Sequence, residues 1–465
     1  MKKQFLIYTS ISIINLLLLL GVFKLFQNEQ VYNSTLGKVS KNYERTGSWN
    51  KYKVKKVSKP YVEINHNNLL WWDASIYHCI SERMYKKEKD CHGNVRAAFF
   101  PLFPSLWKIT NSSAFQIVLI NYSLYAIGLM LLFFLLSKST SYDKTIQFAL
   151  LLTLPTSIIF IIPYTEAMFL FCMAIAAAGI IRNRYYLYFT GALLTAMVRP
   201  ATIFVLFAIL AVELLTACRH RNLKQFLKDS FAKALPFGLG YSLAIIIQYI
   251  SSGSWTAFSD SHAYWSGGVQ KIGAIVDWSI EGFGMNVFAI IVISIPALVF
   301  GLYILVSTLT KSFTFLDTIK ENKSNYLFLV SAFYITGLLI FTLITSKGNL
   351  HSYFRFTLTS PLFYMGVILL LGYIKRTRFR YLFIIYSIAL SLMILFLYNV
   401  PYGGVRFTFS YLGMYLLIIT TAYLIFRKWI PKILDIAMLV VLVSASTVWT
   451  TFLFNSYLSN GWIFT

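Results

Sequence analysis

Long apolar runs recur from the first residues almost to the last, and they limit the fold more than any other feature of the sequence. Each is about as long as a helix needs to cross the roughly 30 Å hydrocarbon layer of a bilayer. Hydrophobic residues make up 57% of the 465 residues and charged residues 12%, and the mean hydropathy is +0.65. Soluble domains carry about twice that charged fraction. The sequence therefore predicts an all-α polytopic membrane protein whose single membrane domain is the whole chain, residues 1–465.

Thirteen runs qualify as membrane spans. They lie near Phe5–Phe26, Ala114–Leu136, Thr145–Ile162, Tyr164–Ile181, Tyr186–Val198, Ala201–Ala217, Leu235–Ile250, Met285–Leu309, Tyr326–Thr345, Phe356–Tyr373, Tyr381–Tyr398, Tyr411–Phe426 and Ile433–Phe454. The runs around Pro163 and Pro200 also fit broken or re-entrant helices, because proline interrupts a helix. Eleven or twelve crossings are therefore alternatives to thirteen.

Positive charge separates by side of the membrane. The net charge is +24, and alternate connections between the spans hold 21 of the 41 Lys and Arg residues, whereas the short connections on the other side hold five. The other fifteen lie between Lys24 and Lys108, at or within one long loop, and long loops are exempt from the positive-inside rule. Basic residues favour the cytoplasmic side, so the N-terminus is predicted inside. Residues 27–113 then form a large first extracytoplasmic loop, and residues 251–284 form a second. Charge placed in this way indicates membrane topology and excludes nucleic acid as a partner.

The first apolar run is followed by no small-residue cleavage site, so we expect an uncleaved signal anchor. Cys79 and Cys91 both fall in the first loop, where a disulfide between them is an open alternative. The chain has no CxxC and no His-rich metal spacing.

The second half of the first loop has the pattern of a helix lying at the membrane interface. If residues Leu70–Met84 are helical, three stripes form: apolar Ile76, Cys79, Ile80 and Met84; polar Asp73, Tyr77 and Ser81; and His78 with Glu82. Trp71 and Trp72 stand where an aromatic belt belongs. Asp73 and Glu82 fall on opposite sides of this helix, which argues against an acid–base pair.

Several motifs resemble, in order along the chain, the PIG-V family of integral-membrane mannosyltransferases. They are WWDASIYHCISE followed by AFFPLFP, then PTSIIFIIPYTEAMF, LLTAMVRPATIF, GSWTAFSDSHAYW and YFRFTLTSPLF, which together extend from about Trp71 to Leu362. The resemblance implies a glycosyltransferase of the GT-C superfamily, with a bundle of about 11–13 transmembrane helices and interfacial helices in its first loop. It also implies a polyprenyl-phosphate sugar donor, mannose as the sugar, and a catalytic aspartate in that loop, which Asp73 matches.

The placement of ionisable residues points to the same side of the membrane. Glu166, Arg199 and Arg355 lie near outward ends of spans, where such residues are expensive and commonly functional. That side lacks nucleotide sugars, so an activated sugar must arrive on a lipid. The sequence also has no P-loop, no DxD pair and no GxGxxG after a strand pattern.

These observations predict roles for ten residues. Asp73 is the general base, and Arg199 and Arg355 bind the donor phosphate. Substrate-binding or orienting roles are expected for Tyr164, Glu166, Trp72, Tyr77, Glu82, His262 and Trp265.

A structural reading stands beside each of these roles. Asp73 is also a plausible helix N-cap, and the two arginines are alternatively interface anchors whose long side chains reach toward the headgroups. Glu166 is either a structural partner of Arg199 or an acceptor contact. His262 and Trp265 also read as a loop histidine and a belt tryptophan.

Two other functions stay open: a transporter or flippase for lipid-linked sugars, and a polysaccharide polymerase or ligase. A transporter predicts polar residues near the bilayer midplane and internal repeats, neither of which the sequence shows. No cofactor is predicted, although a divalent metal beside the phosphate stays open. The expected partners are membrane lipids, the lipid-linked donor, and a glycan, glycolipid or protein acceptor. Lys-, Ile- and Asn-rich usage and the lack of an ER retrieval signal favour a bacterial plasma membrane, with the site facing outside, over the endoplasmic reticulum.

Overall fold

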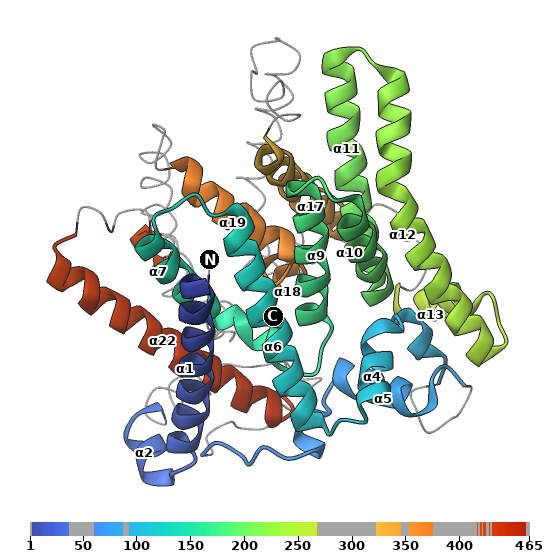
Figure 1. Cartoon of the computed structure of the whole chain (residues 1–465). Coiled ribbons are helices and arrows are strands. Elements are labelled where there is room, and N and C mark those ends of the chain that lie inside the picture. The colour runs from blue at the N-terminus through green and yellow to red at the C-terminus, as the bar shows by residue number, and fades with distance from the viewer. Residues whose placement is uncertain are drawn as a thin grey trace.

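The computed structural model describes residues 2–36, 60–86, 93–266, 322–345, 353–374 and, with short gaps, 416–461 (Figure 1). Its regular structure is helical, and no strand occurs in these ranges. The α-helices are α1 (Lys2–Phe26), α2 (Glu29–Ser34), α4 (Asp73–Arg83), α5 (Leu102–Thr110), α6 (Ala114–Leu136), α7 (Ser141–Leu152), α8 (Ile158–Ile161), α9 (Glu166–Ile181), α10 (Tyr185–Val198), α11 (Ile203–His220), α12 (Leu223–Ser252), α13 (Ala257–Ser266), α17 (Lys323–Thr345), α18 (Tyr353–Leu358), α19 (Pro361–Ile374) and α22 (Lys432–Leu458). Short 3-10 turns are η2 (Asn67–Leu69), η3 (Gly93–Ala98), η4 (Pro155–Ser157) and η5 (Pro200–Thr202).

Six of these helices are long and apolar enough to cross a membrane: α1, α6, α11 with η5, α12, α17 and α22. Helix α7 and the η4–α8 segment, bent by 59° relative to each other, make a seventh if they form one span. The chain is thus a helical integral membrane protein. The predicted spans Met285–Leu309, Tyr381–Tyr398 and most of Tyr411–Phe426 lie outside the described residues, so the total of 11–13 crossings stays a prediction.

Proline interrupts the helices at the two predicted positions, Pro163 and Pro200, and also at Pro361. Helix α8 ends before Pro163 and α9 begins after it, and Pro200 likewise separates α10 from α11. The residues before these prolines are extended, with ψ of 161° at Ile162 and 148° at Arg199, because the proline ring disfavours helical backbone in its predecessor. The predicted continuous span Phe356–Tyr373 is wrong, since α18 ends at Leu358 and α19 begins at Pro361.

Helix α12 is longer than predicted. The apolar run Leu235–Ile250 was expected to be the helix, but α12 begins twelve residues earlier at Leu223. The side chain of Asn222 caps its first turn by accepting a hydrogen bond from the backbone N–H of Gln225 at 2.9 Å. Leucine, lysine and glutamine are good helix formers, so the basic connection continues the helix and Lys224, Lys228 and Lys233 lie on it.

Small residues let the helices of the bundle approach closely. A Cβ atom added to Gly191 of α10 would lie 2.3 Å from the backbone nitrogen of Ala176 on α9. One added to Gly240 of α12 would lie 2.4 Å from the carbonyl oxygen of Leu193 on α10. Contact of this kind is typical of helix packing in membranes. It fixes α9, α10 and α12 side by side (Figure 1).

Residues 60–86 and 93–110 cover one end of the bundle, which we call the loop end (Figure 1). The backbone N–H of Tyr61 donates to the carbonyl of Phe26 at the end of α1. The indole N–H of Trp71 donates to the carbonyl of Leu458 at the end of α22, at 3.0 Å. The last turns of two helices and the loop that carries Asp73 are therefore tied together.

Two ion-pair groups lie at the opposite end, where α12 begins. Arg427 bridges Asp143 on α7 and Asp435 on α22, each at 2.9 Å. Lys233 of α12 pairs with Glu213 of α11. Ion pairs away from the loop end thus join neighbouring helices.

Candidate active site

Helix α4 begins at Asp73, after an unusual backbone turn. Trp72 has φ 55° and ψ −129°, the conformation of the first central residue of a type II′ turn, where glycine is the ordinary choice. The carbonyl of Trp71 accepts from the N–H of Ala74 at 3.1 Å and closes this turn. The predicted start at Leu70 is therefore wrong, and so is the N-cap reading of Asp73. Trp72 occupies the cap position and Asp73 is the first helical residue.

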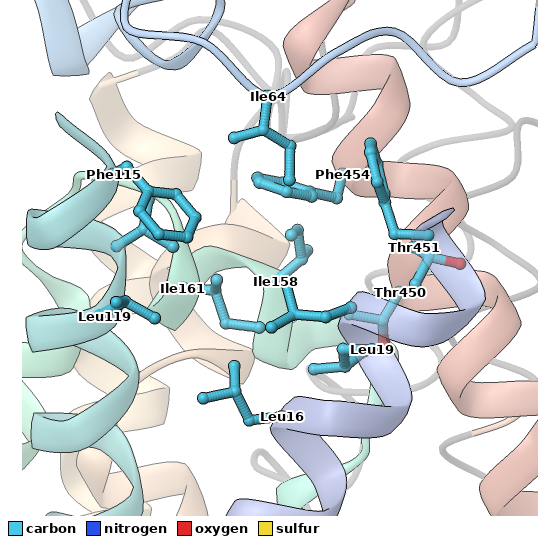
Figure 2. Close-up of a pocket in the computed structure, with 13 residues that line it drawn as sticks. Leu16, Leu19, Ile64, Phe115, Leu119, Ile158, Ile161, Thr450, Thr451 and Phe454 are labelled. Carbon is cyan, nitrogen blue, oxygen red and sulfur yellow. The ribbon is translucent and has the colours of Figure 1, made fainter. Parts of the chain in front are cut away.

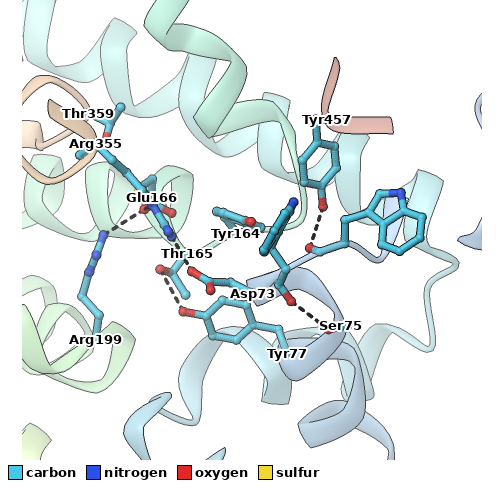
Figure 3. A network of polar contacts seen from close by, with 12 residues as sticks. Asp73, Ser75, Tyr77, Tyr164, Thr165, Glu166, Arg199, Arg355, Thr359 and Tyr457 are labelled. Atoms are coloured by element: carbon cyan, nitrogen blue, oxygen red, sulfur yellow. Dashed lines mark hydrogen bonds and ion pairs between the residues drawn. The ribbon is translucent and has the colours of Figure 1, made fainter. Parts of the chain in front are cut away.

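Four predicted site residues form one continuous chain of ion pairs (Figure 3). Arg355 Nη2 lies 2.8 Å from Asp73 Oδ2. Its Nε donates to Glu166 Oε1 at 2.9 Å. Arg199 Nη1 donates to the same Glu166 oxygen at 3.1 Å. Residues up to 282 positions apart in the sequence thus converge on one point at the loop end.

Glu166 is the centre of this cluster, and Asp73 is its accessible member. The Glu166 side chain is 0% exposed, whereas that of Asp73 is 21% exposed. Two guanidinium groups face two carboxylates, so the formal charges of the cluster balance. A buried carboxylate needs such compensation, because burying an unpaired charge is very costly. Water or a substrate can therefore reach Asp73, while Glu166 is enclosed.

The helix breaks explain why these side chains meet. Glu166 is the first residue of α9, Arg199 is the extended residue after α10, and Arg355 lies on the short α18 just before Pro361. Each break brings a charged residue to the end of a helix or next to it. Irregular backbone of this kind is tolerated at membrane depth only where protein or a cavity surrounds it.

Aromatic rings hold the two guanidinium groups from the side. Arg355 lies 4.6 Å from the centre of the Tyr164 ring, and Arg199 lies 5.3 Å from that of Phe356. Cation–π contacts favour this arrangement. Both arginine side chains are at most 13% exposed and point into the cluster (Figure 3). The alternative reading as interface anchors is therefore wrong.

Tyr77 joins α4 to the start of α9. Its hydroxyl donates to Thr165 Oγ1 over a long 3.4 Å. Burial raises the pKa of Tyr77 well above its ordinary value, with the negative charges of Asp73 and Glu166 acting in the same direction. The phenol therefore stays protonated at any physiological pH and can act only as a neutral hydrogen-bonding group.

The remaining predicted residues have different positions. Trp72 adjoins Asp73 and is 38% exposed. The Glu82 side chain is 56% exposed and pairs with His78 at 3.8 Å, so the structure does not bring it to the cluster. His262 and Trp265 belong to α13, but their side chains lie outside the described part.

Sequence reasoning missed two polar residues that support the site. Asn121, on α6, donates to the carbonyls on both sides of Pro163. Arg96 is 2% exposed and donates to the carbonyl of Met84 at 3.3 Å, at the end of α4. Asn121 lies within a predicted span and was not singled out, and Arg96 falls in a loop stretch with other polar residues, so the sequence offered no clear signal for either. The same helix α4 carries Cys79, which is disulfide-bonded, whereas Cys172 and Cys218 are free.

An apolar pocket lies beside this site, between α1, α6, α8 and α22 (Figure 2). Its cavity volume is small, about 40 Å³. Ile161 and Phe454 line it, each three residues before a tyrosine near the cluster, Tyr164 and Tyr457 respectively. Hydroxyls of Thr450 and Thr451 are the only polar side-chain groups in its lining. The rest of its lining is apolar.

Within the described ranges, no three His, Cys, Asp or Glu side chains gather as ligands of a metal ion would. In comparisons with known proteins, no family model, no curated protein and no solved structure matches the chain. The likeness to the PIG-V family accordingly stays a prediction carried by the motifs quoted above.

Proposed function

We propose that the chain is a membrane glycosyltransferase that moves a sugar from a polyprenyl-phosphate donor to an acceptor hydroxyl. The observation that carries this proposal is the ion-pair chain Asp73–Arg355–Glu166–Arg199 at the loop end. It combines one accessible carboxylate with two guanidinium groups whose forked donors suit a phosphate. The motif resemblance supplies the reaction class, and mannose as the sugar rests on it alone.

Asp73 acts as the general base in this mechanism. The acceptor oxygen bonds to the anomeric carbon while its proton passes to the Asp73 carboxylate. The bond between the anomeric carbon and the phosphate oxygen breaks at the same time, and its electrons leave with the phosphate. A phosphate is a weak base, so the leaving group requires no general acid. This single displacement inverts the anomeric centre.

The arginines serve the departing phosphate. Negative charge grows on it as the bond breaks, and preorganised donors stabilise charge that develops in the transition state. Arg355 contacts Asp73 directly, so a phosphate bound by Arg355 would lie close to the base. Glu166 keeps both guanidinium groups in place and is a positioning residue.

The test is transfer from labelled polyprenyl-phosphate sugars in membranes that contain the Asp73→Asn variant. Loss of a general base typically slows a reaction about 10²–10⁴-fold. We expect a loss of that size, with donor binding retained. The matched control is Glu63→Gln, which changes an exposed carboxylate of the same loop and is expected to leave transfer intact. Unimpaired transfer by Asp73→Asn would exclude the base role, and donor translocation without transfer would favour a flippase.

A further inference from the structure

The interruption between α8 and α9 at Pro163 is stabilised by one side chain of another helix. Asn121 Nδ2, on α6, donates to the carbonyl of Ile162 at 2.6 Å and to that of Tyr164 at 3.0 Å. These carbonyls flank Pro163, where the break between α8 and α9 prevents regular helical hydrogen bonding. The Ile162 carbonyl also accepts from the backbone N–H of Tyr164 at 2.6 Å. A buried acceptor without a donor is costly, so the amide stabilises the break chiefly through the Tyr164 carbonyl.

The orientation of the amide follows from its surroundings. Asn121 is 0% exposed, and its Oδ1 finds no donor among the described residues. The flipped amide would place Oδ1 against two carbonyl oxygens, which repel it. The amide therefore leaves one buried oxygen without a donor while its Nδ2 donates two hydrogen bonds to the backbone at Pro163. An unsatisfied buried oxygen usually costs stability.

The break in turn determines where the ion-pair cluster forms. Only Thr165 separates Tyr164 from Glu166, which receives hydrogen bonds from both Arg199 and Arg355. Tyr164 itself lies against Arg355. A shift of the Ile162–Tyr164 backbone would therefore move Glu166. It would also move Arg355, which is the ion-pair partner of Asp73.

We propose that Asn121 is a positioning residue of the site, which acts through the backbone at Pro163 to fix Glu166 and both arginines. An effect of Asn121 on sugar transfer rests on the proposed function. Its effect on the positions of Glu166 and the arginines does not. Asn15 of α1 provides a matched control. It is also buried, its Nδ2 donates to Tyr122 of α6 at 3.1 Å, and its Oδ1 also has no donor in the described part.

The test is a double-mutant cycle on the apparent melting temperature of the purified full-length protein. Residues in one network give non-additive effects. We expect Glu166→Gln to lower the melting temperature in the Asn121→Leu background by less than half of its effect in the wild type. In the Asn15→Leu background its effect should be unchanged. Additivity with Asn121→Leu would overturn the proposal.

Asn121→Asp keeps the shape of the side chain but donates at most one hydrogen bond. It replaces Asn121→Leu in the cycle if the Asn121→Leu protein does not accumulate in the membrane. If neither accumulates while Asn15→Leu does, Asn121 serves the fold as a whole and the proposal fails. A second readout is transfer itself: Asn121→Leu should lower kcat at least tenfold with the donor KM within threefold. A wild type without transfer would end the proposed function, while the cycle would still decide the role of Asn121.

Discussion

At the scale of single residues, Asp73 and Glu166 are both carboxylates in one cluster, but their surroundings give them different tasks. The enclosed Glu166 balances two guanidinium groups, whereas the partly exposed Asp73 side chain contacts one. The sequence indicated that these residues share one side of the membrane. It also placed Arg355 with them, but it did not indicate that Arg355 contacts Glu166, because a contact between residues 189 positions apart depends on how the helices pack.

Glu166→Gln should therefore reduce stability more than Asp73→Asn does. Removing one partner from a buried ion pair typically costs about 3–5 kcal/mol. Losing one charged hydrogen bond costs about 1.5–3 kcal/mol, and the partial exposure of Asp73 reduces that further. The apparent melting temperatures of the two purified variants, recorded at one heating rate, check the order. The reverse order would mean that Asp73, rather than Glu166, is the structural centre.

Trp72 has a backbone conformation that opposes its residue type. At φ 55°, a residue with a Cβ atom is strained by about 1–2 kcal/mol relative to glycine. Strain of this kind collects at functional sites, and here it directly precedes the proposed base. We expect Trp72→Gly to melt at a higher temperature than Trp72→Ala. At Trp107, inside helix α5, the order should reverse, because glycine weakens a helix by about 1 kcal/mol relative to alanine.

If Trp72→Ala proves the more stable of that pair, the turn relaxes without the strain inferred from its backbone angles. Sequence pattern placed Trp72 in an aromatic belt and gave no indication of this conformation. Trp72 has a positive φ because the chain passes directly from Trp71, which is hydrogen-bonded to the end of α22, into the first turn of α4. Such a requirement arises only in three dimensions.

At the scale of helices, the sequence predicted most of the described spans because bilayer thickness fixes the length of an apolar helix. The Ala114–Leu136 span agrees at both ends. The errors lie where other forces act: α12 extends through a basic stretch with good helix formers, and Pro361 divides a predicted span whose first part also contains threonine and serine. Hydropathy registers neither capping nor a helix break within an apolar run.

The close packing of α9 against α10 gives a prediction at this scale. Gly191→Ala would place a methyl group 2.3 Å from the nitrogen of Ala176, and overpacking typically costs about 1–3 kcal/mol. Because these helices carry Glu166 and Arg199 at adjoining ends, we expect sugar transfer to fall as well as the melting temperature. The control is Gly238→Ala on α12, where no atom lies within 4 Å of the added methyl group. Equal effects at both positions would contradict this packing argument.

At the scale of the whole molecule, the two ends of the bundle differ in chemistry. The loop end gathers the Asp73 cluster, whose carboxylates and guanidinium groups come from four separate segments. The opposite end carries Arg427 between two aspartates, and the basic start of α12. The positive-inside rule assigns the basic end to the cytoplasm. A lipid-linked donor is required only if the loop end faces outward.

Cysteine labelling in intact cells tests that orientation. In a Cys218→Ser parent, which removes the exposed free thiol, Glu63→Cys marks the loop end and Lys228→Cys marks the opposite end. Both positions are exposed. A membrane-impermeant maleimide should label Glu63→Cys in intact cells and Lys228→Cys only after permeabilisation, with the parent measured beside them. The opposite pattern would place Asp73 in the cytosol, where nucleotide sugars are available. An activated sugar would then no longer have to arrive on a lipid, and the proposed donor would lose its physical reason.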